Sequence, residues 1–332
     1  MYMDPFKGED RYCRMTRVAG QKGRELDSLL KSLEGLFGVS RETFRAGSGG
    51  FHGTLFWFPL RQTGSELSST VYSQDKVDNL LAAFKAEAPS LLLFLNNIQR
   101  VNIYARDDTC GPGELFSVGL ASSCLDQVCE ERRKFVAAIR EAGEDLPDEE
   151  CYCLTEVIMK TTDYVAERTK GLADATAKDQ PPAPEGSLSN RSGADSTGRA
   201  GDPDDESNES QRWLVISYHP GRREMSEELS QLCADPELSY RPLVGAAVPM
   251  TSHRTFQSQV FCFLPLPLDT RSPTGLPVHV HGYFSLSQNR RHLKWPTADQ
   301  LTHRAQLDPI LRWNSLLVEE LLPQAYEILL NR

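Results

Sequence analysis

The stretch Gly53-Thr54-Leu55-Phe56-Trp57-Phe58-Pro59-Leu60 constrains the fold more than any other part of the chain. Its Gly-Thr pair is typical of a turn, and the apolar run that follows alternates like a β-strand before it stops at a proline. Phe56 and Phe58 fall on one face of this strand, whereas Leu55 and Trp57 fall on the other. Because both faces are apolar, we expect both to be covered, as for a strand inside a layered α/β domain.

The rest of the chain alternates between helical and strand patterns. Apolar residues recur at helical intervals over 26–37, 77–84, 130–142, 224–232 and 310–322, and Pro323 should kink or split the last of these helices. Strand patterns cover 98–103, 115–118, 152–164, 213–218, 244–249, 259–264 and 278–286. The sequence therefore predicts an α/β (α+β) protein in which helices pack against a mixed sheet.

Residues 170–212 interrupt this pattern. They are rich in Pro, Gly, Ser, Asp and Glu and contain few aliphatic side chains. Such a segment buries too little apolar surface to offset the entropy lost on ordering, so we predict a disordered acidic linker or a long insertion. If it is an insertion, the strands on either side of it can share a sheet.

Composition excludes several classes of protein. The 332 residues carry a formal charge of -10, which argues against indiscriminate nucleic-acid binding. No run approaches the ~20 apolar residues that span a bilayer, and the first residues lack a secretory layout, so we expect no membrane partner and a cytoplasmic location. Eight cysteines spread over this length indicate reduced thiols rather than a disulfide scaffold.

Several long blocks resemble sacsin repeats, in the same order along the chain. They are the Gly-Thr strand through Arg61, Phe261-Cys262-Phe263-Leu264-Pro265-Leu266-Pro267, Gly275–Trp295 and Trp313-Asn314-Ser315-Leu316-Leu317. Sacsins are very large cytoplasmic proteins, similar in part to the large heat-shock ATPase chaperones. They are linked to protein quality control, the Hsp-seventy-class chaperone system and intermediate filament organisation. The resemblance implies protein partners, either chaperone machinery or clients.

The Gly53-Thr54 pair also resembles the last motif of the Bergerat-fold (GHKL) ATPases, in which the threonine touches adenine. That fold also needs a Glu-x-x-x-Asn helix and an Asp-x-Gly-x-Gly turn before this strand, and neither pattern occurs upstream of Gly53. Without the carboxylate base and the metal site, in-line hydrolysis has no route. We therefore expect no catalytic residue and no cofactor in this chain, with ATP and Mg²⁺ bound only if an upstream half completes the pocket.

The resemblance implies a division into four parts. Residues 1–62 are expected to be the C-terminal remnant of a GHKL-like nucleotide domain and 63–169 an α/β repeat segment. The disordered linker at 170–212 and a second α/β segment with C-terminal helices at 213–332 complete the chain.

Arg290 and Arg291 are candidate phosphate contacts. In the heat-shock chaperones an arginine from the following domain reaches the terminal phosphate of the nucleotide, and these two are similar in position and type. The alternative is that both pair with carboxylates or cover a sheet edge.

His279 and His281 share one face of a predicted strand, as two metal ligands would, but no third ligand lies nearby in sequence, so we predict no metal site. Two hypotheses about function remain. The preferred one is a non-catalytic sacsin-repeat module of a chaperone-like quality-control scaffold that binds proteins. The alternative is part of a GHKL chaperone-type ATPase whose catalytic residues lie outside this chain.

Overall fold

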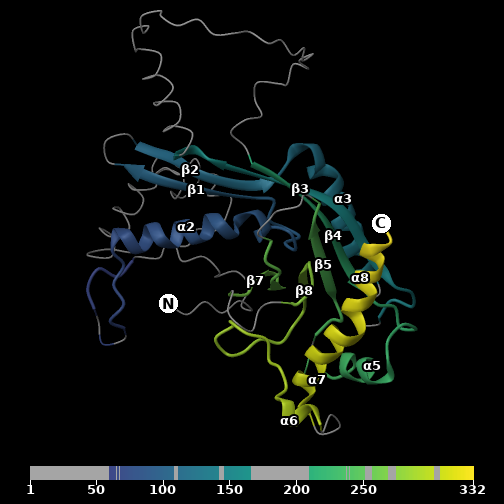
Figure 1. The fold of residues 1–332 in the computed structure, drawn as a ribbon. Helices are drawn as coiled ribbons and strands as arrows, with labels where there is room; N and C mark the ends of the chain where they lie inside the picture. The colour runs from purple at the N-terminus through teal and green to yellow at the C-terminus, as the bar shows by residue number, and fades with distance from the viewer. Residues whose placement is uncertain are drawn as a thin grey trace, which may run out of the picture. The chain divides into compact units, whose positions relative to one another are not determined.

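The fold was determined as a computed structural model (Figure 1). It describes residues 60–64, 66, 68–107, 111–141, 146–165, 209–236, 238, 240–250, 256–267, 274–302 and 307–332. The chain divides into two compact units, one made of residues 1–78 and 104–113 and the other of residues 79–103 and 114–332. The helix predicted at 26–37 and the strand predicted at 53–60, apart from Leu60, lie outside the described residues.

An eight-stranded mixed sheet forms the centre of the described fold. Its order is β1-β2-β3-β4-β5-β8-β6-β7, with β6 and β8 parallel and the other pairs for which registers are resolved antiparallel. The strands are β1 (Arg100–Asp107), β2 (Gly111–Leu120), β3 (Cys151–Asp163), β4 (Glu209–His219), β5 (Val244–Pro249), β6 (Val260–Cys262), β7 (Leu264–Pro265) and β8 (His279–Gly282). The predicted α/β class with a mixed sheet is confirmed.

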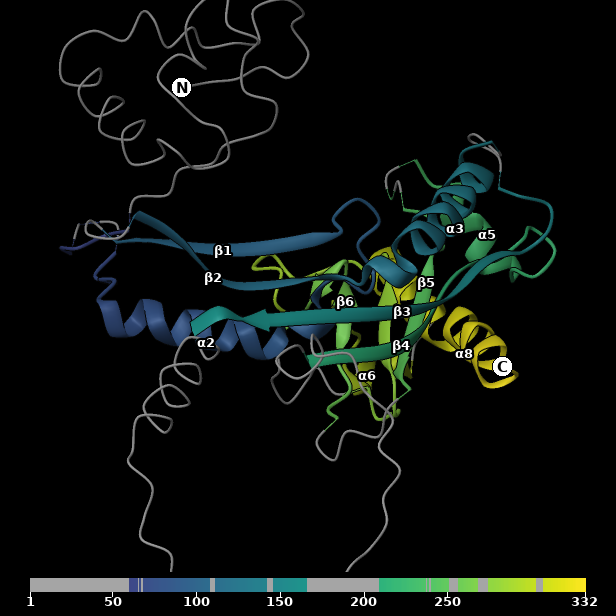
Figure 2. The ribbon, with the colours of Figure 1, turned by 90° about the horizontal axis from the view of Figure 1, so that it is seen from above.

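Helices pack on both faces of the larger unit's sheet, α3 on one face and α8 on the other. The described helices are α2 (Gln74–Leu91), α3 (Ser122–Glu141), α5 (Glu227–Cys233), α6 (Ala298–Leu301), α7 (Pro309–Leu316), the π-helical turn η4 (Leu317–Leu321) and α8 (Leu322–Leu330). Figure 2, which views the chain from above, shows α3 and α8 on opposite sides of β3 to β5.

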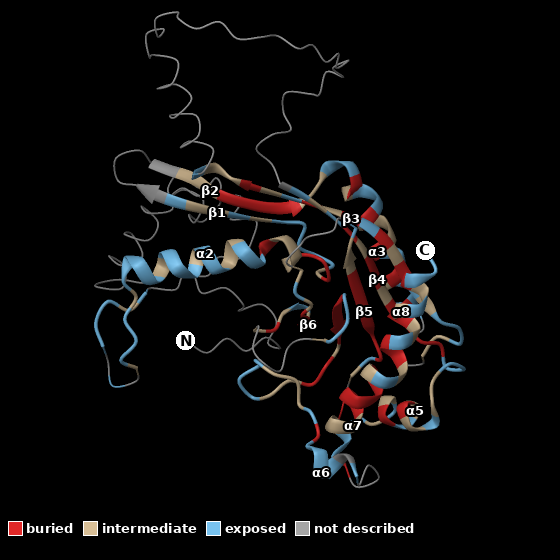
Figure 3. Cartoon of the chain, in the orientation of Figure 1, coloured by how far each residue is buried: buried red, intermediate tan, exposed pale blue. Residues whose placement is uncertain are grey.

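Period-two alternation in β4 divides the core into two layers. Ile216 and Tyr218 pack with the side chains of α5, α7, η4 and α8, whereas Trp213 and Val215 pack with α3 and the end of α2. All four side chains are at most 4% exposed. Figure 3 shows this burial as a red band along β4 and β5 and the facing sides of the C-terminal helices.

The strands on either side of the predicted linker are neighbours in the sheet. β3 and β4 pair antiparallel over eleven positions, from Cys151 opposite His219 to Thr161 opposite Glu209. The strands before and after the predicted linker therefore share one sheet, as expected if the linker is an insertion between paired strands. Glu209–Arg212 have no strand-like composition, and they extend the strand because β3 supplies backbone partners for them.

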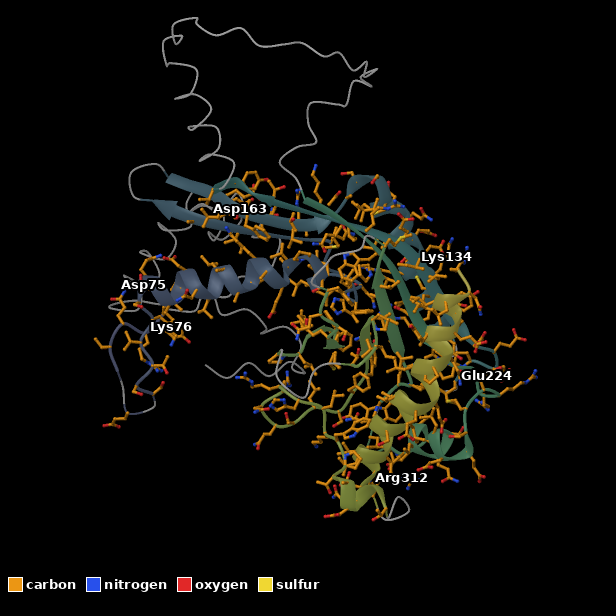
Figure 4. The ribbon with its side chains drawn as sticks, viewed as in Figure 1. Asp75, Lys76, Lys134, Asp163, Glu224 and Arg312 are labelled. Carbon is orange, nitrogen blue, oxygen red and sulfur yellow. The ribbon has the colours of Figure 1, made fainter. Side chains whose placement is uncertain are left out.

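The helix predicted before Pro323 is split as expected. The backbone N–H of Leu322 donates to the carbonyl of Leu317, five residues back, so one wide turn separates α7 from α8. Pro323 then occupies the first turn of α8, directly after the wide π turn. Arg312 on α7, which is labelled in Figure 4, forms a 2.5 Å ion pair with Glu228 on α5, and this pair ties the two helices together.

A buried arginine holds the turn after α2. The guanidinium of Arg132 on α3 donates to the carbonyl oxygens of Leu93, at 2.8 Å, and of Leu95, at 2.6 Å. Burial lowers the pKa of Arg132, because desolvation opposes its charge. The carbonyl oxygens of Leu93 and Leu95 accept hydrogen bonds from this buried charge.

We expect Arg132→Met to lower the free energy of unfolding by about 2 kcal/mol, because it leaves two backbone carbonyls unpaired while keeping the length of the stem. Urea unfolding measures this change. The matched control is Arg133→Met on the same helix, whose side chain is 71% exposed. Equal losses for the two variants would contradict the role given to Arg132.

Candidate functional site

A cavity of about 760 Å³ lies between the sheet and the C-terminal helices of the larger unit. Ala246, Val260, Val278 and Val280 line it from the sheet and the segment leading into β8. Val318, Leu322, Pro323 and Tyr326 line it from η4 and α8. The π turn matters here because it carries Val318, which forms one wall together with residues of α8.

The mouth of the cavity is formed by two irregular segments. Thr274 and Leu276 come from the segment before β8, and His292, Leu293, Trp295 and Thr297 come from the segment after it. Leu276 is 41% exposed and Trp295 is 44% exposed, so large apolar side chains stand at the entrance. Among the described residues, none that lines the cavity is Asp, Glu, Lys or Arg. The described lining is therefore suited to apolar groups.

A hairpin-like turn connects β8 to this mouth. Leu286 pairs with Leu293 in an isolated antiparallel bridge, and the Ser287 N–H donates to the His292 carbonyl at 2.8 Å. At the tip of the turn, the Arg290 N–H donates to the Ser287 carbonyl at 2.7 Å. Arg290 has a φ of 56°, a left-handed conformation that is uncommon for residues other than glycine.

Asn314 on α7 fixes the base of this turn. Its amide oxygen accepts the Ser285 N–H at 2.8 Å, and its amide nitrogen donates to the carbonyls of Ser285, at 2.8 Å, and Lys294, at 2.7 Å. The neighbouring Trp313 donates its indole N–H to the Tyr283 carbonyl at 3.0 Å and stacks on Tyr240. The Trp-Asn pair thus joins the C-terminal helix to both strands of the turn.

The predicted site residues separate into two groups. Gly53 and Thr54 lie outside the described residues, so their contact with adenine stays a prediction. Arg290 and Arg291 lie at the exposed tip of the turn, and the chain continues from them directly to His292 at the mouth of the cavity. Their contact with a phosphate also stays a prediction. Glu327 and Asn331 have the Glu-x-x-x-Asn spacing, but they follow the Gly-Thr strand, and the N–H of Asn331 bonds the Glu327 carbonyl at the end of α8.

His279 and His281 share one face of β8, as predicted, and aromatic rings surround both. His279 stacks on Trp213, and His281 stacks on Phe94 with its Nδ1 accepting the Phe263 N–H at 3.3 Å. Burial lowers the pKa of each histidine to about 4, so both are neutral at pH 7. Over the part of the chain that the structure describes, no three His, Cys, Asp or Glu side chains gather as a metal site would require.

The described cysteines are free thiols, in agreement with the sequence prediction. Burial raises the pKa of Cys153 and of Cys233 to about 11, so both thiols stay protonated at neutral pH and are poor nucleophiles. Of the helices that the structure describes, none combines the length and the apolar composition that crossing a membrane requires.

Sequence reasoning missed the cavity, although it found blocks that build it. The Phe261–Pro267 block includes β7 and most of β6, Gly275–Trp295 supplies β8 and the mouth, and Trp313–Leu317 supplies the anchor of the turn. Gly275–Trp295 therefore supplies lining residues itself, and the other two blocks directly adjoin the lining residues Val260 and Val318. One pattern in the sequence could have indicated the cavity wall. The alternation in Val278-His279-Val280-His281 places Val278 and Val280 on one face of the strand, toward the C-terminal helices.

Two comparisons with known proteins support the resemblance to sacsins. The model of the family described as Sacsin domain matches residues 8–114. Sacsin from Homo sapiens is 32% identical to this chain over 318 residues, a match that covers 92% of the chain. The chain is sacsin-like. It spans only 6% of the length of human sacsin, so that match covers one small part of a far longer protein. No solved structure matches the sacsin-like chain.

Proposed function

We propose that this chain is a non-catalytic sacsin-repeat module of a chaperone-like quality-control scaffold and that it binds protein partners through the cavity. The occupant is an extended, unfolded segment that presents bulky apolar side chains. The observation that carries the proposal is an open apolar cavity of about 760 Å³ with exposed Leu276 and Trp295 at its mouth. Exposed apolar side chains around a concave surface are typical of places where proteins bind other proteins.

The chemistry of the lining favours binding over catalysis. Its polar groups are hydroxyls and one imidazole, from Thr274, Thr297, Tyr326 and His292. These groups can position a peptide backbone, and the described part of the lining has no carboxylate or cation to move a proton or to stabilise phosphate charge. The chaperone-like part of the proposal rests on the resemblance to sacsin.

The test measures binding of a fluorescein-labelled peptide with the central sequence Leu-Phe-Leu and serine flanks to the full chain, followed by fluorescence anisotropy. Val318→Trp places a large ring in the helical wall of the cavity. We expect it to raise the Kd at least about tenfold, since it excludes the apolar side chains. Trp295→Ala should weaken binding to a smaller extent, because it removes only a contact at the mouth.

Leu80→Trp is the matched control, because Leu80 is an exposed apolar residue on α2 that does not line the cavity. Its Kd should equal that of the unmodified chain. Thermal melts of all variants check that each is folded. The proposal fails if the peptide does not bind the unmodified chain, or if Val318→Trp and Leu80→Trp bind it equally well.

A further inference from the structure

The turn that carries Arg290 and Arg291 is built as a fixed platform. Asn289 accepts the Arg291 N–H at 3.2 Å through its side-chain oxygen, and the Ser287 hydroxyl accepts the His292 N–H at 3.2 Å. Together with the bonds from Asn314 at its base, these contacts hold the tip relative to the cavity. The left-handed backbone of Arg290 is unfavourable for a residue other than glycine, and such conformations persist where the surroundings enforce them.

Both guanidinium groups are available at the surface. Arg290 and Arg291 are exposed, and neither forms an ion pair with a described residue. The expected alternative, pairing with carboxylates, is therefore not realised within the described part of the chain. An unpaired, planar cation at the surface is suited to a carboxylate from outside, which it can bind with two parallel hydrogen bonds.

Charge is segregated along the sequence around this turn. Residues 274–298 contain no Asp or Glu and carry the positive charges of Arg290, Arg291 and Lys294, whereas the whole chain has a formal charge of -10. The described lining of the cavity is mostly apolar. The mouth therefore combines an apolar recess with a positive border, in a protein that is otherwise acidic.

We infer that the cavity selects peptide segments in which a bulky apolar side chain is flanked by aspartate or glutamate. The apolar side chain enters the recess, and the flanking carboxylates pair with Arg290 and Arg291. This inference rests on the proposed function and names the chemistry of the partner. Electrostatic complementarity of this kind sets the choice of partner and the rate of association more than the total affinity.

The experiment compares three labelled peptides with the same Leu-Phe-Leu centre and with flanks of Glu-Asp, Ser-Ser or Lys-Lys. We expect the acidic flanks to bind the full chain about tenfold more tightly than the serine flanks, and the lysine flanks to bind most weakly. The advantage of the acidic flanks should shrink between about 50 mM and about 500 mM NaCl, because salt screens exposed charges.

The charge-removing variant is Arg290→Asn combined with Arg291→Ser, in which asparagine tolerates the left-handed backbone. It should bind the acidic and serine peptides equally and leave the Kd of the serine peptide unchanged. The matched control is Arg222→Ser combined with Arg223→Ser, an exposed arginine pair that lies outside the cavity lining. The control should keep the full preference for acidic flanks.

The outcomes separate this inference from the proposed function. Equal affinity for all three flanks, with binding still lost in Val318→Trp, would overturn the charge selection and leave the proposed function standing. A preference for acidic flanks that survives in the Arg290→Asn, Arg291→Ser variant would also overturn it. No binding of any peptide would overturn both.

Discussion

Lowering the pH from about 6.5 to about 4 is expected to cost the folded chain about 3 kcal/mol for each of His279 and His281. Both imidazoles have a folded-state pKa of about 4 because burial opposes their charge, whereas an unfolded histidine titrates near 6.5. As the pH falls through this window, the unfolded chain takes up protons that the folded chain does not. Stability is therefore fully present above about pH 6.5 and is lost as the pH falls toward 4.

Urea unfolding at a series of pH values measures this slope. The variant His279→Phe with His281→Phe keeps two rings in the aromatic cluster but removes both protonation sites, so its slope between pH 6.5 and 4 should be much shallower. Tyr283→Phe is the control, since Tyr283 packs against His281 but burial raises its pKa, away from the acid range. A double variant with the same acid slope as the unmodified chain would disprove the assignment.

Replacing Asn314 by leucine should lower the free energy of unfolding by about 4 kcal/mol. Leucine has a similar size but cannot pair with the Ser285 N–H or with the carbonyls of Ser285 and Lys294, and Asn314 is completely buried. The Ser285 N–H and the Lys294 carbonyl then lose their partner inside the protein, whereas the Ser285 carbonyl still accepts the Lys294 N–H. Urea unfolding measures the loss, and Asn331→Leu at the exposed end of α8 is the matched control.

The same variant should loosen the turn before the whole chain unfolds. Hydrogen exchange at the N–H of Ser285 and of Lys294 should accelerate in Asn314→Leu, because the first donates to Asn314 and the second to the Ser285 carbonyl that Asn314 also holds. Unchanged protection at both amides would show that Asn314 does not anchor the turn. Asn331→Leu should leave both amides unchanged.

Sequence patterns predicted the elements well where local periodicity and burial agree. The strand at 152–164 became β3, because its alternating side chains face the two core layers. The helix predicted over 130–142 begins earlier, at Ser122, because Cys124 and Val128 pack into the core with Val157 and Met159. A strand distant in sequence supplies those partners, so no local pattern marks the first two turns of α3.

The cavity could not be predicted in the same way. It is built from five separate parts of the chain, and its helical wall depends on the π turn before Pro323. In the sequence, the proline indicates that the helix is interrupted but not that a π turn forms there. The arginine pair was found by its composition. Its backbone conformation, however, is held by hydrogen bonds within the turn and by Asn314, which lies 20 to 29 residues from its partners in the sequence. The domain boundaries and the contact of Thr54 with adenine stay predictions.

The β3–β4 ladder has a consequence for variation in chain length. Because Thr161 and Glu209 lie opposite each other in the sheet, the residues between them close a loop on a base that eleven paired positions already hold. Closing such a loop costs only about 0.6 kcal/mol more for each doubling of its length. Insertions or deletions in this segment can therefore change its length and charge at little cost to folding, while the paired strands keep their register.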